Sequence, residues 1–111
     1  MKTHLVQDHR LFKATLKAAA KLRLEKLNGY GLSYRNFGSI GVAARIGDKL
    51  ERIKCLLENK RNRYHHVKSE NLYDSAVDII NYGAMLAMEI NRECKNELSN
   101  RVPKPSIKNK K

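Results

Sequence analysis

Apolar residues recur at helical spacing in three stretches of the chain, and this pattern predicts three α-helices. The first stretch covers residues 4–27, which contain neither glycine nor proline. Asn28 and Gly29 mark its end, because glycine just after the last apolar position is typical of a helix C-cap. The apolar positions that predict this helix are Leu5, Phe12, Leu16, Ala19, Ala20, Leu22, Leu24 and Leu27.

The second predicted helix covers residues 39–60. Ser39 suits its N-cap, because a serine hydroxyl accepts a hydrogen bond from the first helical N–H groups. The apolar positions follow one another in steps of three and four residues, so they predict one buried seam along the helix. The seam consists of Ala43, Ile46, Leu50, Ile53 and Leu57.

The third predicted helix follows a basic, non-periodic loop over residues 59–68, has Ser69 as its N-cap and extends to Leu98. Apolar residues occupy a wide arc of this helix, so we expect it to be the most buried of the three. The predicted fold is all-α, with a three-helix antiparallel core that dimerisation would complete. Residues 1–98 form the single domain, and residues 99–111 form a basic disordered tail.

Positive charge dominates the composition. Lysine and arginine number 23 against 11 acidic residues, which gives a net charge of +12 over 111 residues. Such an excess favours phosphate-bearing partners, either nucleotides or nucleic acid bound by the basic surface and tail. The alternative is that the charge only keeps a small protein in solution. The basic loop at residues 59–68 also has two interpretations. It is either an electrostatic lid or a solvated loop with no partner.

Two cysteines, Cys55 and Cys94, fall in helical patterns and lack the spacing of metal ligands. We predict that both are buried free thiols, as expected in a reducing cytoplasm. No stretch is long and apolar enough to span a membrane, and the N-terminus lacks the apolar core of a signal peptide. The predicted location is therefore the cytoplasm, with no membrane partner.

Glycine and aromatic residues gather between the first two helices. From Gly29 to Gly38, three glycines and three aromatic residues lie within ten positions. Glycine lets the backbone approach a ligand closely, and tyrosine or phenylalanine can stack on a base. The spacing matches neither the phosphate loop nor the dinucleotide fingerprint. An ordinary connection, whose aromatic side chains close the end of the core, would explain the same composition.

A row of basic residues with interleaved acids lies on the second predicted helix. The basic residues are Arg45, Lys49 and Arg52, and the acids are Asp48 and Glu51. This row is the expected wall of a polar pocket beside the turn. Pairing of Asp48 with both arginines within the helix is the alternative, and such surface pairs contribute about 0.3–0.5 kcal/mol each.

Polar residues also share one face of the third helix, at Glu70, Asp74, Asp78 and Asn81. Carboxylates on an otherwise apolar helix need a partner if they are buried. That partner would be either the basic row of the second helix, across a helix interface, or a hard cation. If that face is exposed, no partner is needed.

Three of these segments together resemble the nucleotide modification associated domain, type 1, a family of small α-helical proteins of bacteria and phages. The segments are Tyr30-Gly31-x-Ser33, Arg45-x-x-Asp48-Lys49-x-x-Arg52 and Glu70-x-x-x-Asp74-x-x-x-Asp78-x-x-x-Tyr82, and the resemblance covers residues 11–90. It implies a role in modified-nucleotide metabolism, in the host cytoplasm if a phage encodes the chain.

A second resemblance is to the all-α nucleotide pyrophosphatases of the MazG kind, which hold magnesium with carboxylates from neighbouring helices. Asp48-x-x-Glu51 is similar to the first carboxylate pair of that family. Asp74 and Asp78 stand four residues apart, where the family has a spacing of three. This resemblance implies Mg²⁺ bound by Asp48, Glu51, Asp74 and Asp78, and magnesium needs only one or two carboxylates beside phosphate oxygens and water.

The leading hypothesis from the sequence is a nucleotide-binding α-helical protein. In it, arginine and lysine meet phosphate and tyrosine stacks on a base. A magnesium-dependent pyrophosphohydrolase and a basic nucleic-acid-binding or host-interaction protein are the alternatives, and no catalytic residue is assigned. The predicted nucleotide-binding residues are Tyr30, Gly31, Ser33, Tyr34, Arg45, Lys49, Arg52 and Tyr82.

Overall fold

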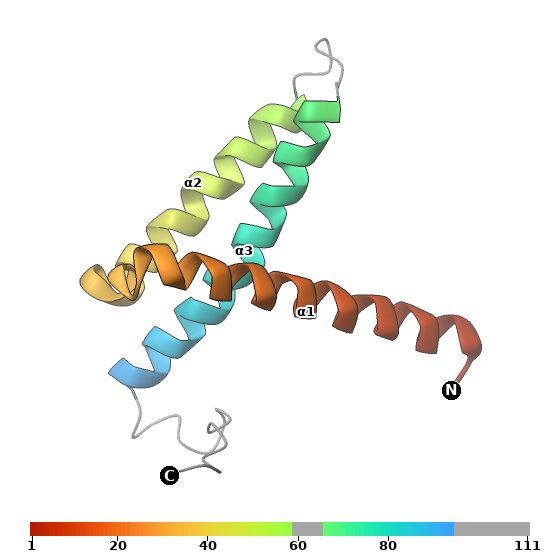
Figure 1. Cartoon of the computed structure of the whole chain (residues 1–111), viewed down its shortest axis with the longest axis horizontal. Coiled ribbons are helices and arrows are strands. Elements are labelled where there is room, and N and C mark those ends of the chain that lie inside the picture. Colours follow the sequence, from red (N-terminus) through yellow and green to blue (C-terminus); the bar gives the residue numbers. More distant parts are fainter. Residues whose placement is uncertain (59–65, 95–111) are drawn as a thin grey trace.

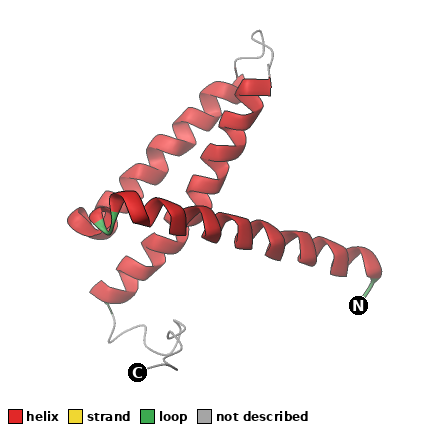
Figure 2. Cartoon of the chain, viewed as in Figure 1, coloured by secondary structure: helices red, strands yellow, loops and turns green. Residues whose placement is uncertain are grey.

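The computed structural model describes residues 1–58 and 66–94, with side chains in the second range from residue 71 onward. The elements are α1 (Thr3–Tyr30), the short 3₁₀ helix η1 (Ser33–Phe37), α2 (Gly38–Glu58) and α3 (His66–Glu93). Over these described ranges the chain is helical with no strand (Figure 2). The predicted all-α fold with three long helices is confirmed.

The helices α2 and α3 run antiparallel, side by side, and α1 crosses α3 (Figure 1). The crossing is held by the buried Asn81 side chain, whose Nδ2 donates a hydrogen bond of 2.9 Å to the backbone oxygen of Ala19. Ala19 is itself buried, so it is the point where α1 enters the body of the molecule. The small buried apolar set of the described residues is Ala19, Val42, Val77 and Met85.

The N-terminal half of α1 projects away from α2 and α3 (Figure 1). We call residues 3–18 the arm. Within the arm only Val6 and Thr15 are half-buried, and every other side chain is exposed. Helix formation in the arm therefore depends on its own residues, whereas α1 beyond Ala19 is supported by α3.

The glycine that caps α1 stands two residues later than the sequence predicts. Gly31, not Gly29, has a positive φ of 61°, and its N–H donates a hydrogen bond of 2.9 Å to the oxygen of Leu27. Only glycine adopts such a conformation without strain, so the chain leaves the helix at Gly31. The extra residues extend α1 to Tyr30, which brings that side chain to the junction with η1.

Helix α2 begins at Gly38, one residue before the predicted N-cap Ser39. A carboxylate from the end of α3 satisfies its first turn. Glu93 accepts hydrogen bonds from the Ser39 backbone nitrogen at 2.9 Å and from the Ser39 Oγ at 2.7 Å. These bonds lower the pKa of Glu93 below its usual value. A negative charge at this position also suits the helix dipole, and Gly38 leaves room for it, because a Cβ there would lie 2.8 Å from Glu93 Oε2.

The buried seam of α2 is shifted from the predicted one. Ile46 and Ile53 are half-buried as expected, but Ala43, Leu50 and Leu57 are exposed. The covered side of α2 has Lys49 at its centre, and its ammonium group pairs with Asp78 of α3. The apolar pattern alone cannot indicate that a lysine is covered. The covered positions are Val42, Ile46, Lys49, Ile53 and Leu56.

Both cysteines are free, but the prediction that both are buried is wrong for Cys55, which is exposed. Cys55 lies beside the covered seam of α2, not on it. Cys94 is half-buried.

Helix α3 begins at His66, so the predicted N-cap Ser69 lies inside the helix. The residues between His66 and Ser69 include neither glycine nor proline, so nothing in them interrupts a helix. Besides the buried Ser75, four buried positions of α3 recur every four residues, and two of these four are polar side chains. These positions are Val77, Asn81, Met85 and Glu89.

Several predictions fall on residues that the structure does not describe. The basic segment at residues 59–65, the extension of the third helix to Leu98 and the tail at residues 99–111 all lie outside the described ranges. Of the helices in the described part, none combines the length and apolarity that a membrane span requires.

Candidate functional site

A pocket of about 440 Å³ lies where α1, η1, α2 and α3 meet. This volume is in the range of small-molecule sites, about 300–1,000 Å³. Seven of the eight residues predicted to bind a nucleotide line it, and they come from all four elements. These seven are Tyr30, Gly31, Ser33, Tyr34, Arg45, Lys49 and Tyr82.

Arg52 is the predicted binding residue that does not line the pocket. Arg45 and Lys49 are one turn apart on α2, and both reach the pocket. Arg52 lies a further turn along α2, away from η1, and is exposed. The basic row thus continues beyond the pocket that its first two members line.

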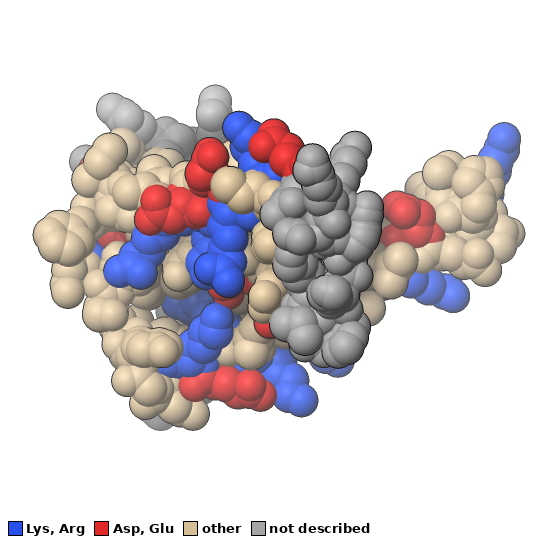
Figure 3. All heavy atoms as spheres, turned by 90° about the horizontal axis from the view of Figure 1, so that it is seen from above, with Lys and Arg blue, Asp and Glu red and all other residues tan. Residues whose placement is uncertain are grey.

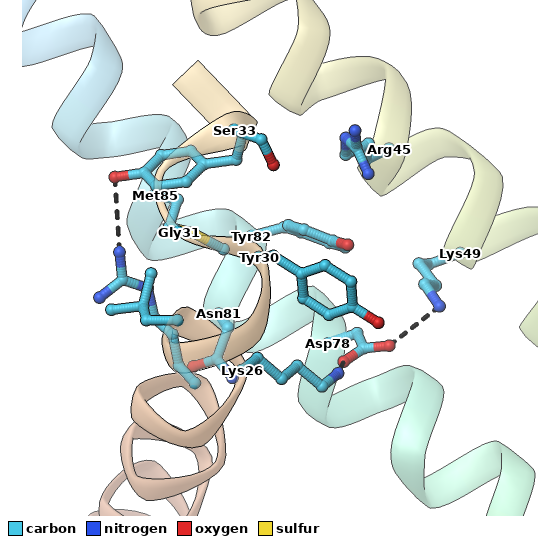
Figure 4. A pocket seen from close by; sticks show the side chains of 13 residues that line it. Lys26, Tyr30, Gly31, Ser33, Arg45, Lys49, Asp78, Asn81, Tyr82 and Met85 are labelled. Atoms are coloured by element: carbon cyan, nitrogen blue, oxygen red, sulfur yellow. Dashed lines mark hydrogen bonds and ion pairs between the residues drawn. The ribbon is translucent and has the colours of Figure 1, made fainter. Parts of the chain in front are cut away.

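A two-lysine bridge holds the base of the pocket together. Asp78 of α3 is 13% exposed at its side chain, and its two oxygens contact Lys26 Nζ at 2.8 Å and Lys49 Nζ at 2.9 Å. The bridge joins all three long helices (Figure 4). The expectation that an acid of the third helix pairs with the basic row therefore holds for Asp78 and Lys49.

The bridge also sets the ionisation of its members. Burial disfavours the charged form of Asp78, but hydrogen bonds from both lysines outweigh it and lower the pKa of that carboxyl. The hydrogen bond to Asp78 raises the pKa of Lys26. Asp78 and Lys26 are therefore charged at neutral pH, and the carboxylate of Asp78 is shared between two lysines.

The pocket has more positive than negative charge. Its titratable lining includes four cationic side chains, Arg23, Lys26, Arg45 and Lys49, against the single carboxylate of Asp78. In the described part of the chain, no ion pair engages Arg45. The Nε of Arg23 is buried and has no hydrogen-bond partner among the described residues. A buried donor without an acceptor is costly, so the lining favours an anion.

Aromatic side chains line the pocket next to these cations. Tyr30 and Tyr82 direct their hydroxyl groups toward the space that Arg45 and Lys49 also face (Figure 4). The guanidinium carbon of Arg23 lies 5.6 Å from the ring centre of Tyr34, and its Nη2 donates to the Tyr34 hydroxyl at 3.4 Å. Tyr30 is 74% exposed, so a ligand can reach its ring from solvent.

A buried carboxylate on α3 contacts η1. Glu89 is 5% exposed and accepts a hydrogen bond from Arg92 on the same helix. It also lies 3.8 Å from Nε of Arg35, which belongs to η1. This contact holds η1 against α3 and so fixes Ser33 and Tyr34 at the rim of the pocket.

Five lining residues were not assigned to the pocket from the sequence, and three of them are polar. The apolar pattern of the first predicted helix does not single out polar residues at the same spacing. Arg23 and Lys26 follow the buried Ala19 in steps of four and three residues, a signal that they share its face. The missed residues are Arg23, Lys26, Leu27, Asn81 and Met85.

The four carboxylates predicted to hold magnesium are not brought together. Asp48, Glu51 and Asp74 are exposed, and none of them lines the pocket. No group of three or more His, Cys, Asp or Glu residues that could hold a metal ion occurs among the described residues. Asp78 does line the pocket, but its oxygens are engaged by two lysines.

Pairing within α2 does not account for the basic row either. Among the described residues, no ion pair joins Asp48 to Arg45 or Arg52. The space-filling view shows basic side chains gathered on one face of the body, with acidic side chains among them (Figure 3). Figure 3 also shows the N-terminal end of α1 projecting from that body.

No family model matches the chain, and the searches of curated proteins and of solved structures return no match. The two family resemblances therefore stay predictions from the sequence, and the pocket is the observation that bears on function.

Proposed function

We propose that this protein binds a phosphate-bearing nucleotide in the pocket between α1, η1, α2 and α3. One observation supports the proposal above all others. Four cationic side chains and three tyrosines, drawn from different elements, line one cavity with a single carboxylate. The cations can bind phosphate, and the tyrosines can contact a base or sugar. The lining therefore offers the groups that both parts of a nucleotide require.

The phosphate end of the ligand lies at α2. Arg45 makes no ion pair among the described residues, and its planar guanidinium can donate two parallel hydrogen bonds to phosphate oxygens. Lys49 is next to it, one turn along α2. The base end lies at Tyr30 and Tyr82, where an exposed ring offers a stacking surface.

Asp78 acts as a fixed counter-ion in this arrangement. It holds the ammonium groups of Lys26 and Lys49 in place before a ligand arrives, so less side-chain entropy is lost when the ligand binds. With its oxygens engaged by lysines, Asp78 has little capacity to coordinate a cation. The pocket therefore recognises phosphate through its own cations, without a bridging metal.

The experiment is a calorimetric titration of the full-length chain with nucleoside mono-, di- and triphosphates and with the parent nucleosides. We expect at least one phosphorylated nucleotide to bind and its nucleoside to bind weakly. Arg45→Ala should weaken binding about tenfold to a hundredfold, the usual loss for a charge-assisted hydrogen bond. Arg52→Ala is the matched control on the same helix and should change affinity less than about twofold.

Two outcomes would contradict the proposal. One is a folded protein that binds no member of the panel. The other is equal weakening by Arg45→Ala and Arg52→Ala, which would indicate binding by general surface charge. Binding to duplex DNA that falls steeply with salt would then favour the nucleic-acid alternative. Chromatography of the same mixtures detects hydrolysis, and pyrophosphate release that stops on chelation would instead favour the pyrophosphohydrolase.

A further inference from the structure

One row of residues runs along the whole of α1. Its positions follow one another in steps of four and three residues, which keeps them on one side of the helix. In the body of the molecule the row is Ala19, Arg23, Lys26 and Tyr30, where Ala19 is buried and the other three line the pocket. In the arm the same row continues as Leu5, His9, Phe12 and Leu16.

The arm part of this row is apolar and uncovered. Leu5, Phe12 and Leu16 are 48%, 56% and 39% exposed. The rings of His9 and Phe12 are stacked with centroids 6.0 Å apart, which joins the leucines at either end into one strip. An uncovered helix of this length is only marginally stable in water, so a partner that covers the strip would stabilise the arm.

We propose that a second copy of this chain covers the arm, with the two arms packed antiparallel about a two-fold axis. The strip is self-complementary when the axis lies between Arg10 and Leu11. Leu5 then lies opposite Leu16 of the second copy, and His9 lies opposite Phe12 of the second copy. Each contact occurs twice, as the symmetry of such an interface requires.

The α1–α3 interface determines the orientation of the pair. The arm strip is the direct continuation of the face of α1 that packs on α3 from Ala19 onward. Antiparallel arms overlap only along residues 3–18, so each arm ends beside Ala18 of the other, before α3 begins to cover the row. A parallel partner would continue into the space that α3 occupies. The length of the uncovered strip therefore matches the overlap of two antiparallel arms.

Sedimentation equilibrium of the full-length chain over a range of concentrations tests the proposal. Only a few large apolar side chains per arm are covered, so we expect a reversible association. The mass should rise with concentration from the 12.8 kDa of one chain toward twice that value. Phe12→Glu should raise the dissociation constant about a hundredfold, because one phenylalanine is lost from each side of the interface.

Leu11→Glu is the matched control. Leu11 is 67% exposed, lies in the arm, and points away from the strip, about 100° round the helix from Phe12. It undergoes the same change of charge, and we expect its dissociation constant to change less than about threefold. Helix content measured by circular dichroism should be the same for both variants when they are monomeric. A chain that stays monomeric at all concentrations, or equal weakening by the two variants, would overturn the proposal.

Cross-linking tests the direction of the pair in a chain that carries Cys55→Ser and Cys94→Ser. Leu5→Cys chains mixed with Leu16→Cys chains should give a disulfide between the two kinds under mild oxidation. Cross-linking of Leu5→Cys chains only to themselves would show parallel arms and would overturn the antiparallel pairing. The proposed nucleotide site does not enter either experiment, so the two proposals fail or hold separately.

Discussion

The two halves of α1 carry the same row of positions with opposite chemistry. In the covered half, which packs on α3 at the buried Ala19, the row contains two cations and a tyrosine, and these side chains line a pocket that is open to solvent at Tyr30. In the arm, the row contains two leucines and a phenylalanine, and they are exposed on the part of α1 that projects away from α2 and α3. Polarity alone would place the apolar residues against the body of the molecule and the polar residues on the projecting arm. We explain the polar half by a ligand and the apolar half by a partner.

The largest effect on folding is expected where the covered half meets α3. Asn81→Ala removes the buried hydrogen bond to Ala19, and we expect the free energy of unfolding to fall by about 1–3 kcal/mol. Thr15→Ala is the counterpart in the arm, because it removes a 2.9 Å hydrogen bond from Oγ1 to the Leu11 oxygen. That change should stay within about 0.5 kcal/mol. Urea unfolding measures the free energy of unfolding of both variants. Equal losses of stability would contradict the difference between the two halves of α1.

The next effect depends on pH and concerns the bridge at Asp78. The pKa of Asp78 is lowered from its usual 3.8, so its contribution to stability is present above pH 3.8 and is lost as the pH falls through the lowered value. The pKa of Lys26 is raised from 10.5, so its contribution is present below pH 10.5 and is lost as the pH rises through the raised value.

Asp78→Asn should therefore be less stable than the wild type between these limits, and the difference should shrink as the pH is lowered below 3.8. Thermal unfolding at a series of pH values measures the two curves. Glu93→Gln is a comparison away from the bridge, because Glu93 ends α3 and contacts Ser39 at the start of α2. Its pKa is also lowered, so its stability difference should likewise shrink at low pH. A difference for Asp78→Asn that did not change with pH would contradict the assigned charge state.

The smallest effect is expected from removing metal ions. Because Asp78 is engaged by lysines and the other three predicted carboxylates do not line the pocket, nucleotide affinity should be the same in magnesium and in chelator. We expect less than about a twofold difference, beyond the change that magnesium makes to the charge of the nucleotide itself. Adenosine monophosphate and its triphosphate, titrated in both buffers, provide the measurement. Tight binding that requires magnesium would argue against recognition by the protein cations alone.

Sequence patterns predicted the helices well and their boundaries less well. Periodicity over long stretches identifies α1, α2 and α3, because each has a sustained apolar pattern. The ends depend on single backbone conformations, so Gly31 could not be distinguished from Gly29 before its positive φ was known. The cap of α2 could not be predicted at all, because Glu93 is distant in sequence from Ser39.

Most of the α1 side of the pocket was not predicted. The glycine-aromatic turn and the basic residues of α2 stood out because they are clustered in sequence, and Asp78 and Tyr82 of α3 were predicted as well. Arg23 and Lys26 were not predicted, and Asn81 was named only as part of a polar face, because their contribution depends on how α1 crosses α3. The exposure of Leu50 was missed for a related reason, since the neighbouring Lys49 takes the covered position only when Asp78 lies opposite.

The long-range bonds of α1 have a consequence for the order in which the molecule assembles. Asn81 to Ala19 and Asp78 to Lys26 span 62 and 52 residues, so closing these contacts costs more chain entropy than pairing α2 with its neighbour α3. We expect α2 and α3 to associate first and α1 to dock afterward. Because the pocket needs α1, it exists only in the docked chain. A molecule that binds there would slow the undocking of α1.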